Sequence, residues 1–252
     1  MARKMAQPKA DDEKDSGKMS VVEHLAELRR RLIICIAALI AGFIVAYIFS
    51  DHILVVLIAP IKRVLSPEES LAILKVQEAF VTRIKVAFMA AAIAAFPVII
   101  RQVWAFVVPA LKKREAKVGL TLVIASTVLF AAGILFAYFT ILPYAFTFFL
   151  KSAQGIAAPN ISLAFYVNFC ARILLAFGLV FQLPLVIVFL VRSGVVTLDQ
   201  VKKARRYAIV IIFVAAAIVT PPDALTQILM AIPLLALYEL SILAAYLLRK
   251  HD

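Results

Sequence analysis

Residues 120–141 read LTLVIASTVLFAAGILFAYFTI, a run without a charged side chain. As an α-helix this run would be about 33 Å long, slightly more than the roughly 30 Å hydrocarbon core of a bilayer. Its apolar residues surround the helix on every side instead of marking one face, which is typical of a helix buried in lipid or protein. The run therefore predicts a membrane-spanning helix.

Further apolar runs lie on both sides of this one. Of the 252 residues, 64% are hydrophobic and 17% are charged, a balance that excludes a large soluble core. We expect an all-α polytopic membrane protein in which residues 19–248 form a domain of six spans, between a disordered cytosolic tail (1–18) and a short cytosolic tail (249–252). The predicted spans are residues 32–50, 83–110, 119–142, 164–191, 207–220 and 224–248.

Lys and Arg residues gather on one side of this predicted bundle. If the N-terminus is cytoplasmic, 19 of the 27 Lys and Arg residues lie in the inner loops and tails, whereas six lie in the outer loops. Inner loops of membrane proteins carry such an excess, so both termini are predicted in the cytoplasm. Topology thus explains the net charge of +12, and no nucleic-acid partner is expected.

The first outer connection and the fifth span have unusual lengths. The loop at residues 51–82 is long and partly apolar, so we expect it to fold back as a cap on the membrane surface. Residues 207–220 would make a helix of only about 21 Å, ended sharply by Pro221 and Pro222. We therefore expect the protein to perturb the bilayer most at this corner.

Residue types that carry catalysis or bind metals are sparse. The three histidines, His24, His52 and His251, are scattered, and the sequence has no Gly-rich phosphate loop. Cys35 and Cys170 are expected at different depths, so we predict no disulfide. We expect neither an enzyme nor a bound metal or cofactor.

Two glutamates, Glu27 and Glu115, are expected at the inner membrane surface. A capping box at Ser20–Glu23 predicts that a helix begins there and runs into the first span, which places Glu27 at the interface. The simplest interpretations are an i,i+4 ion pair between Glu27 and Arg31 and a solvated loop charge at Glu115. Alternatively, the two carboxylates bind two guanidinium groups of a cationic ligand, because carboxylates accept Arg bidentately.

Arg101, Gln182 and Glu239 are polar residues within the predicted spans. Each lies about nine or ten residues from the inner end of its span, roughly 14 Å deep. An ionisable side chain at that depth is costly unless it is paired, so we hypothesise that Arg101 and Glu239 neutralise each other in a polar belt with Gln182. In the alternative, Arg101 extends alone towards the inner surface.

Five motifs, in order along the six predicted spans, resemble those of the TatC family, whose members are subunits of the twin-arginine protein translocase. The resemblance covers roughly residues 19–248. The motifs are His24-Leu25-Ala26-Glu27-Leu28-Arg29; Ala59-Pro60; Gln102-Val103-Trp104-Ala105-Phe106 with Pro109-Ala110-Leu111 and Glu115; Phe177-Gly178 before Pro184; and Thr220-Pro221-Pro222-Asp223.

The resemblance implies a concave six-helix receptor in the cytoplasmic membrane of a bacterium. Such a receptor binds twin-arginine signal peptides of folded cargo, recruits single-span partners of the TatA and TatB type, self-associates, and uses the protonmotive force. Glu27 and Glu115 match the glutamates implicated in twin-arginine recognition, and Arg29 and Phe106 match neighbouring positions of that site.

Three more positions acquire a meaning from the resemblance. Pro60 matches an outer-loop proline and Asp223 an aspartate of the last outer turn, both with structural or partner-contacting roles. Gln182 departs from the pattern, because some members carry a glutamate there. An amide cannot change its charge, but it can hydrogen-bond a polar residue of a partner helix.

Two other functions are compatible with a six-span chain. A small-molecule transporter would line a solute path with Arg101, Gln182 and Glu239, but no internal repeat is visible. A structural scaffold would bind no peptide. Discrimination between Arg-Arg and Lys-Lys peptides separates the receptor from both.

Overall fold

The computed structural model describes residues 21–65, 71–107, 116–153, 160–220 and 224–249. These residues are almost entirely helical, and among them the only β pairing is an isolated bridge between Ala72 and Ser162. The all-α prediction is confirmed. The helices are α1 (Val21–Ile48), α2 (Ser50–Lys62), α3 (Glu78–Val107), α4 (Ala116–Phe136), α5 (Leu142–Ala153), α6 (Leu163–Val180), α7 (Leu183–Arg192), α8 (Leu198–Lys203), α9 (Arg205–Val219) and α10 (Ala224–Arg249).

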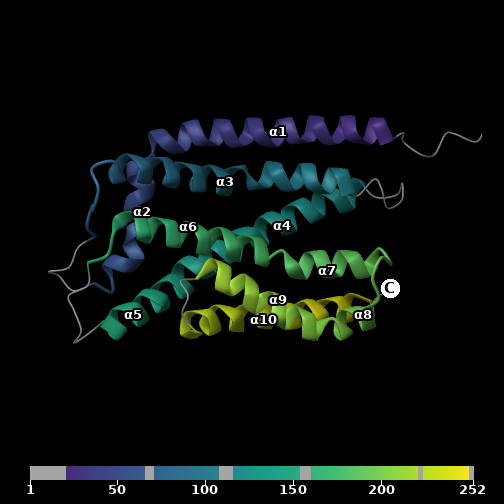
Figure 1. Cartoon of the computed structure of the whole chain (residues 1–252). Helices are drawn as coiled ribbons and strands as arrows, with labels where there is room; N and C mark the ends of the chain where they lie inside the picture. The colour runs from purple at the N-terminus through teal and green to yellow at the C-terminus, as the bar shows by residue number, and fades with distance from the viewer. Residues whose placement is uncertain (1–20, 66–70, 108–115, 154–159, 221–223, 250–252) are drawn as a thin grey trace, which may run out of the picture.

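Helices α1 and α3 pack side by side along most of their length (Figure 1). The start of α1, the end of α3, α8 and the end of α10 lie at one end of the molecule, whereas α2, the end of α5 and the start of α6 lie at the other. By the distribution of Lys and Arg, the first of these ends is the inner one.

In the described part of the chain, five helical stretches are long and apolar enough to cross a bilayer: Glu23–Ile48, Glu78–Val107, Gly119–Ser152, Leu163–Arg192 and Thr226–Leu248. The remaining predicted span is α9, whose 15 residues give a length of about 22 Å. This helix is shorter than the roughly 30 Å hydrocarbon core, as the sequence indicates.

Prolines explain where the helices differ from the predicted spans. The helix that begins at Ala116 continues past residue 142 to Ala153, through a π-helical turn that stands just before Pro143. The stretch predicted as one span at 164–191 is interrupted after Val180, because Pro184 lacks the N–H that would bond the Val180 carbonyl. The outer segment 51–82 is also not mainly a loop, because α2 begins directly after α1.

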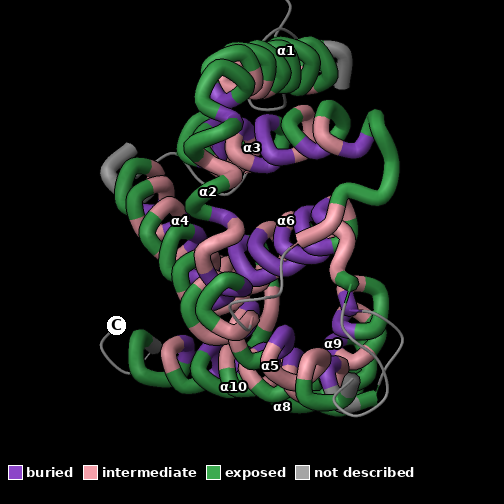
Figure 2. The backbone as a smooth tube through the Cα atoms, turned by 90° about the vertical axis from the view of Figure 1, so that its left-hand side faces the viewer, coloured by how far each residue is buried: buried purple, intermediate pink, exposed green. Residues whose placement is uncertain are grey.

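A close crossing of α4 and α6 forms the centre of the bundle, where buried segments are concentrated (Figure 2). Gly133 and Gly178 permit this approach. A Cβ on Gly133 would lie 2.6 Å from the carbonyl oxygen of Phe177, and one on Gly178 would lie 2.6 Å from Cε2 of Phe130. Small residues at helix crossings give membrane proteins van der Waals contact that lipid cannot supply.

The outer segments are tied together by the carboxylate of Glu78, which is buried at the first residue of α3. Glu78 accepts hydrogen bonds from the backbone N–H groups of Leu74 (2.7 Å), Lys75 (3.2 Å) and Ala164 (2.8 Å), and from the hydroxyl of Ser162 (2.7 Å). A single side chain thereby joins the segment before α3 to the start of α6.

Helix α2 is held against the bundle by two tyrosines. The hydroxyl of Tyr166 donates to the carbonyl of Leu57, and that of Tyr138 donates to the carbonyl of Val56, both at 2.6 Å. Pro60 is buried within the same helix. The expected outer cap is thus a helix anchored by side chains of α6 and of the η2 turn, Ala137–Ile141.

Replacement of Gly133 by Ala should destabilise the protein by about 1–3 kcal/mol, because the added methyl group meets the backbone of α6. Thermal unfolding in detergent measures the effect. Gly119→Ala is the matched control on the same helix, since a Cβ there has no described neighbour within 4 Å. Equal melting temperatures for the two variants would contradict the close α4–α6 crossing.

Candidate functional site

The inner end of α1 carries an ion pair that is also hydrogen-bonded to α3. Arg31 donates from Nε to Oε1 of Glu27 at 3.0 Å and from Nη2 to the same oxygen. Its Nη1 also donates to Oε1 of Gln102 on α3, at 3.4 Å. The side chains of Arg31 and Glu27 are 20% and 29% exposed, so the pair is shielded but remains open to the inner surface.

An aromatic contact between α1 and α3 lies next to this ion pair, one helical turn closer to the inner end. The rings of His24 and Phe106 stack with centroids 4.4 Å apart and planes inclined by 21°. Phe106 lies one turn beyond Gln102 on α3, and His24 lies one turn before Glu27 on α1. We call the group formed by His24, Glu27, Arg31, Gln102 and Phe106 the inner seam.

Arg29 lies outside the inner seam. It is exposed and lines a shallow pocket of about 510 Å³ with Ala26, Arg30, Ile33 and Ile34. The structure therefore brings two of the predicted recognition residues, Glu27 and Phe106, to one seam and places Arg29 on another face of α1. Glu115, the other predicted carboxylate, lies outside the described residues, as does Asp223.

The hypothesis that Arg101 pairs with Glu239 is wrong. Glu239 instead accepts a hydrogen bond from Nη2 of Arg205 at 2.7 Å, with both side chains about half exposed. Helix α10 packs mainly against α7, α8 and α9, whereas Arg101 is an exposed residue of α3, which packs mainly against α1, α2, α4 and α6. Equal depth in the membrane did not mean proximity.

Gln182 also lies apart from Arg101 and Glu239, and its side chain bonds backbone carbonyl groups near the break between α6 and α7. Its Nε2 donates to the carbonyl oxygens of Ser126 (3.1 Å) and Gly178 (3.4 Å). Its own backbone N–H bonds Leu179, three residues earlier, where the chain turns from α6 into α7. The Gln182 side chain thus supplies a donor to Gly178 where the helical pattern is interrupted, and Oε1 is buried with no hydrogen-bond partner among the described residues.

The sequence did not reveal the polar link between α3 and α4. Nε1 of the buried Trp104 donates to the hydroxyl of Ser126 at 2.9 Å. Because Ser126 also accepts from Gln182 through its carbonyl, one residue of α4 connects the inner half of α3 with the α6–α7 break. The only indication in the sequence was a Trp within an apolar run, whose N–H needs an acceptor when buried.

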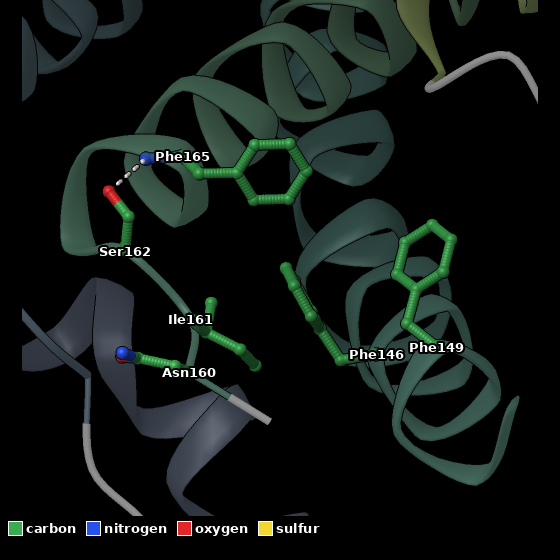
Figure 3. A pocket seen from close by; sticks show the side chains of 6 residues that line it. All are labelled: Phe146, Phe149, Asn160, Ile161, Ser162 and Phe165. Atoms are coloured by element: carbon green, nitrogen blue, oxygen red, sulfur yellow. Dashed lines mark hydrogen bonds between the residues drawn. The ribbon is translucent and has the colours of Figure 1, made fainter. Parts of the chain in front are cut away.

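A second pocket lies at the outer end, between the last turns of α5 and the start of α6 (Figure 3). Its volume is about 360 Å³, and its lining residues are Phe146, Phe149, Asn160, Ile161, Ser162 and Phe165. The hydroxyl of Ser162 caps α6 by accepting from the backbone N–H of Phe165 at 3.3 Å. This pocket is mainly aromatic, and none of these lining side chains carries a charge, so it does not match a cationic ligand.

The chain is similar to known proteins over most of its length. Residues 23–233 match the family model described as Sec-independent protein translocase protein (TatC). The Sec-independent protein translocase protein TatC of Desulforapulum autotrophicum is 40% identical over 237 residues, which cover 94% of this chain and 88% of that protein. The TatC of Escherichia coli K12 is 36% identical over 222 residues, 88% of this chain and 86% of that protein.

A solved structure is similar in both fold and sequence. The crystal structure of the twin-arginine translocase receptor TatC superposes with a TM-score of 0.82 and is 42% identical. The superposition covers 89% of this chain and 98% of that one.

The Arg205–Glu239 pair should be coupled, and Arg101 should be independent of both. In double-mutant cycles with Gln substitutions, we expect about 0.2–1 kcal/mol of coupling between Arg205 and Glu239, as for exposed ion pairs. Unfolding in detergent measures each cycle. Coupling of Glu239 to Arg101 with none to Arg205 would contradict the observed pairing.

Proposed function

The chain belongs to the TatC family of Sec-independent protein translocase proteins, and on that premise we propose that it is the receptor for twin-arginine signal peptides of folded cargo. The observation that carries the proposal is the hydrogen bonding of the Glu27 carboxylate. This carboxylate accepts two hydrogen bonds from the guanidinium group of Arg31 at the inner surface. An arginine side chain is the ligand that such a site is built to hold.

The recognition mechanism needs no catalytic residue. Charge-assisted hydrogen bonds between a guanidinium and a carboxylate are roughly twice as strong as neutral ones, and the planar donors of Arg fit where the single ammonium of Lys does not. In our proposal Glu27 holds one arginine of the signal peptide and Glu115 holds the other. The second assignment rests on the family resemblance of Glu115.

Three neighbouring residues complete the proposed site. The stacked rings of Phe106 and His24 present an aromatic surface beside Glu27, on which a guanidinium or an apolar side chain of the peptide can pack. Arg29 is exposed on the next face of α1 and would act on acidic or backbone groups of the peptide outside the seam. The apolar stretch of the signal peptide then inserts along the helical surface.

We further propose that this chain works in the cytoplasmic membrane of a bacterium with single-span partners of the TatA and TatB type. Helix α9 has 15 residues and is shorter than the hydrocarbon core, so we expect the bilayer to be locally thinner beside α10. Pro60 and Asp223 are proposed as structural or partner-contacting residues at the outer side. Self-association and use of the protonmotive force complete the proposal by analogy with the family.

A solute transporter gains no support from the polar residues of the spans. Arg101, Gln182 and Glu239 would have to line one path, but each has a different structural neighbourhood. The receptor function is therefore the one that we put to the test.

We expect membranes that contain the protein to bind an Arg-Arg signal peptide about tenfold or more tightly than the same peptide with Lys-Lys. Glu27→Gln and Glu115→Gln should each remove most of this preference, because a hydrogen bond to a charged group contributes about 1.5–3 kcal/mol. Site-specific photocrosslinking and equilibrium binding measure it. Glu23→Gln, which alters a carboxylate one turn earlier on α1, is the control and should retain the preference; binding indifferent to all three changes would refute the proposal.

Gln182→Leu should weaken assembly with the partners more than it weakens peptide binding. Leucine cannot replace the two hydrogen bonds that hold the α6–α7 break to α4 and α6, and hydrogen bonds within membranes contribute roughly 0.5–2 kcal/mol. Co-purification of the single-span partners with wild type and variant measures the effect. Equal recovery of partners would remove Gln182 from this role.

A further inference from the structure

Within the inner seam, the carboxylate of Glu27 is paired with an arginine of the chain itself. Two nitrogens of the Arg31 guanidinium donate to Glu27, which leaves the carboxylate neutralised. A signal peptide that arrives at Glu27 therefore meets a carboxylate that is already paired with a guanidinium group through Oε1. In this respect Arg31 differs from its neighbours Arg29 and Arg30, which are exposed on the other face of α1.

Arg31 also has a hydrogen-bond partner other than Glu27. Its Nη1 donates to Oε1 of Gln102 on α3, so the guanidinium lies between the two helices. Loss of the Glu27 contact would leave Arg31 with this amide and with the inner aqueous surface, because the side chain is 20% exposed. The arrangement allows exchange without burial of an unpaired charge, which would be costly.

We propose that Arg31 is a built-in stand-in for the signal-peptide arginine, and that peptide binding is an exchange of one guanidinium for another on Glu27. This inference rests on the proposed receptor function. Arg31 releases Glu27 and keeps Gln102 as the peptide arginine forms the same pair of hydrogen bonds. During the exchange the carboxylate of Glu27 always keeps a guanidinium partner. The free energy gained by binding the peptide arginine is reduced, because an equivalent pair of hydrogen bonds to Arg31 is broken.

The exchange lowers the affinity of the site for every cationic peptide. It does not change the ratio of the affinities for Arg-Arg and Lys-Lys peptides. An internal competitor weakens every ligand of Glu27 by the same factor, so it leaves the preference for Arg over Lys unchanged. It does lower the affinity of all cationic segments, which keeps weak Lys-containing peptides unbound while bidentate Arg-Arg peptides still bind. Arg31 in this sense sets the affinity of the site, and it acts by competition.

Two substitutions of Arg31 test the exchange. Arg31→Gln removes the competitor, whereas Arg31→Lys keeps the charge and loses the two guanidinium donors that share Oε1 of Glu27. Both should bind an Arg-Arg peptide more tightly than wild type, by about two- to fivefold for Arg31→Gln, the size expected of one partly exposed ion pair. Affinity for the matched Lys-Lys peptide should rise by the same factor.

The control variants are Arg30→Gln and Arg30→Lys, which make the same changes one residue away, where the side chain is exposed. If general electrostatic repulsion were responsible, Arg31→Gln and Arg30→Gln would gain equally and neither Lys variant would change. That pattern would overturn the inference, as would unchanged or weaker binding by both Arg31 variants. Because the expected result is a gain of affinity, a folding defect cannot imitate it.

A double variant separates this inference from the receptor function. Glu27→Gln with Arg31→Gln should bind as weakly as Glu27→Gln alone, since no carboxylate remains to be released. Binding that depends on Glu27 but is unaffected by Arg31 would sink the exchange alone. Retention of tight binding without Glu27 would instead refute the receptor site itself.

Discussion

The interior of a lipid bilayer offers no hydrogen-bond partners, and the structure follows from that constraint. Backbone groups are satisfied within helices, and several buried polar side chains donate hydrogen bonds to other groups of the protein. Trp104 bonds Ser126, Tyr166 bonds the carbonyl of Leu57, and the amide of Gln182 bonds the two carbonyls at the α6–α7 break. Most of the charged residues gather towards the helix ends and the connections between them, so recognition chemistry is expected at the two surfaces.

At the inner surface, the constraint acts on the carboxylate of Glu27. Glu27 is shielded enough for an unpaired charge to be unfavourable, and Arg31 neutralises it from one turn away on the same helix. The simple interpretation of Glu27 as half of an i,i+4 pair and the interpretation as a ligand site therefore do not exclude each other. In the proposed exchange, an incoming guanidinium replaces Arg31 in this pair.

Much of this could be predicted from the sequence, because hydrophobic length and proline position act locally. The all-α fold, the short α9 and the Glu27–Arg31 spacing all follow from residue order. The pairing of Arg101 with Glu239 could not be predicted, because depth along a helix says nothing of which helices are neighbours. Glu78 was missed for the same reason, since two of its four donors lie more than 80 residues away along the chain.

The most direct measurement of the central claim is the position at which an Arg-Arg signal peptide contacts the protein. A photoreactive residue placed next to the second arginine of the peptide, followed by mass spectrometry of the adducts, reports that position in intact membranes. The account predicts adducts on the inner seam, at His24, Gln102 and Phe106, with suppression by excess Arg-Arg peptide. Adducts confined to the α9–α10 side or to the outer cap would contradict it.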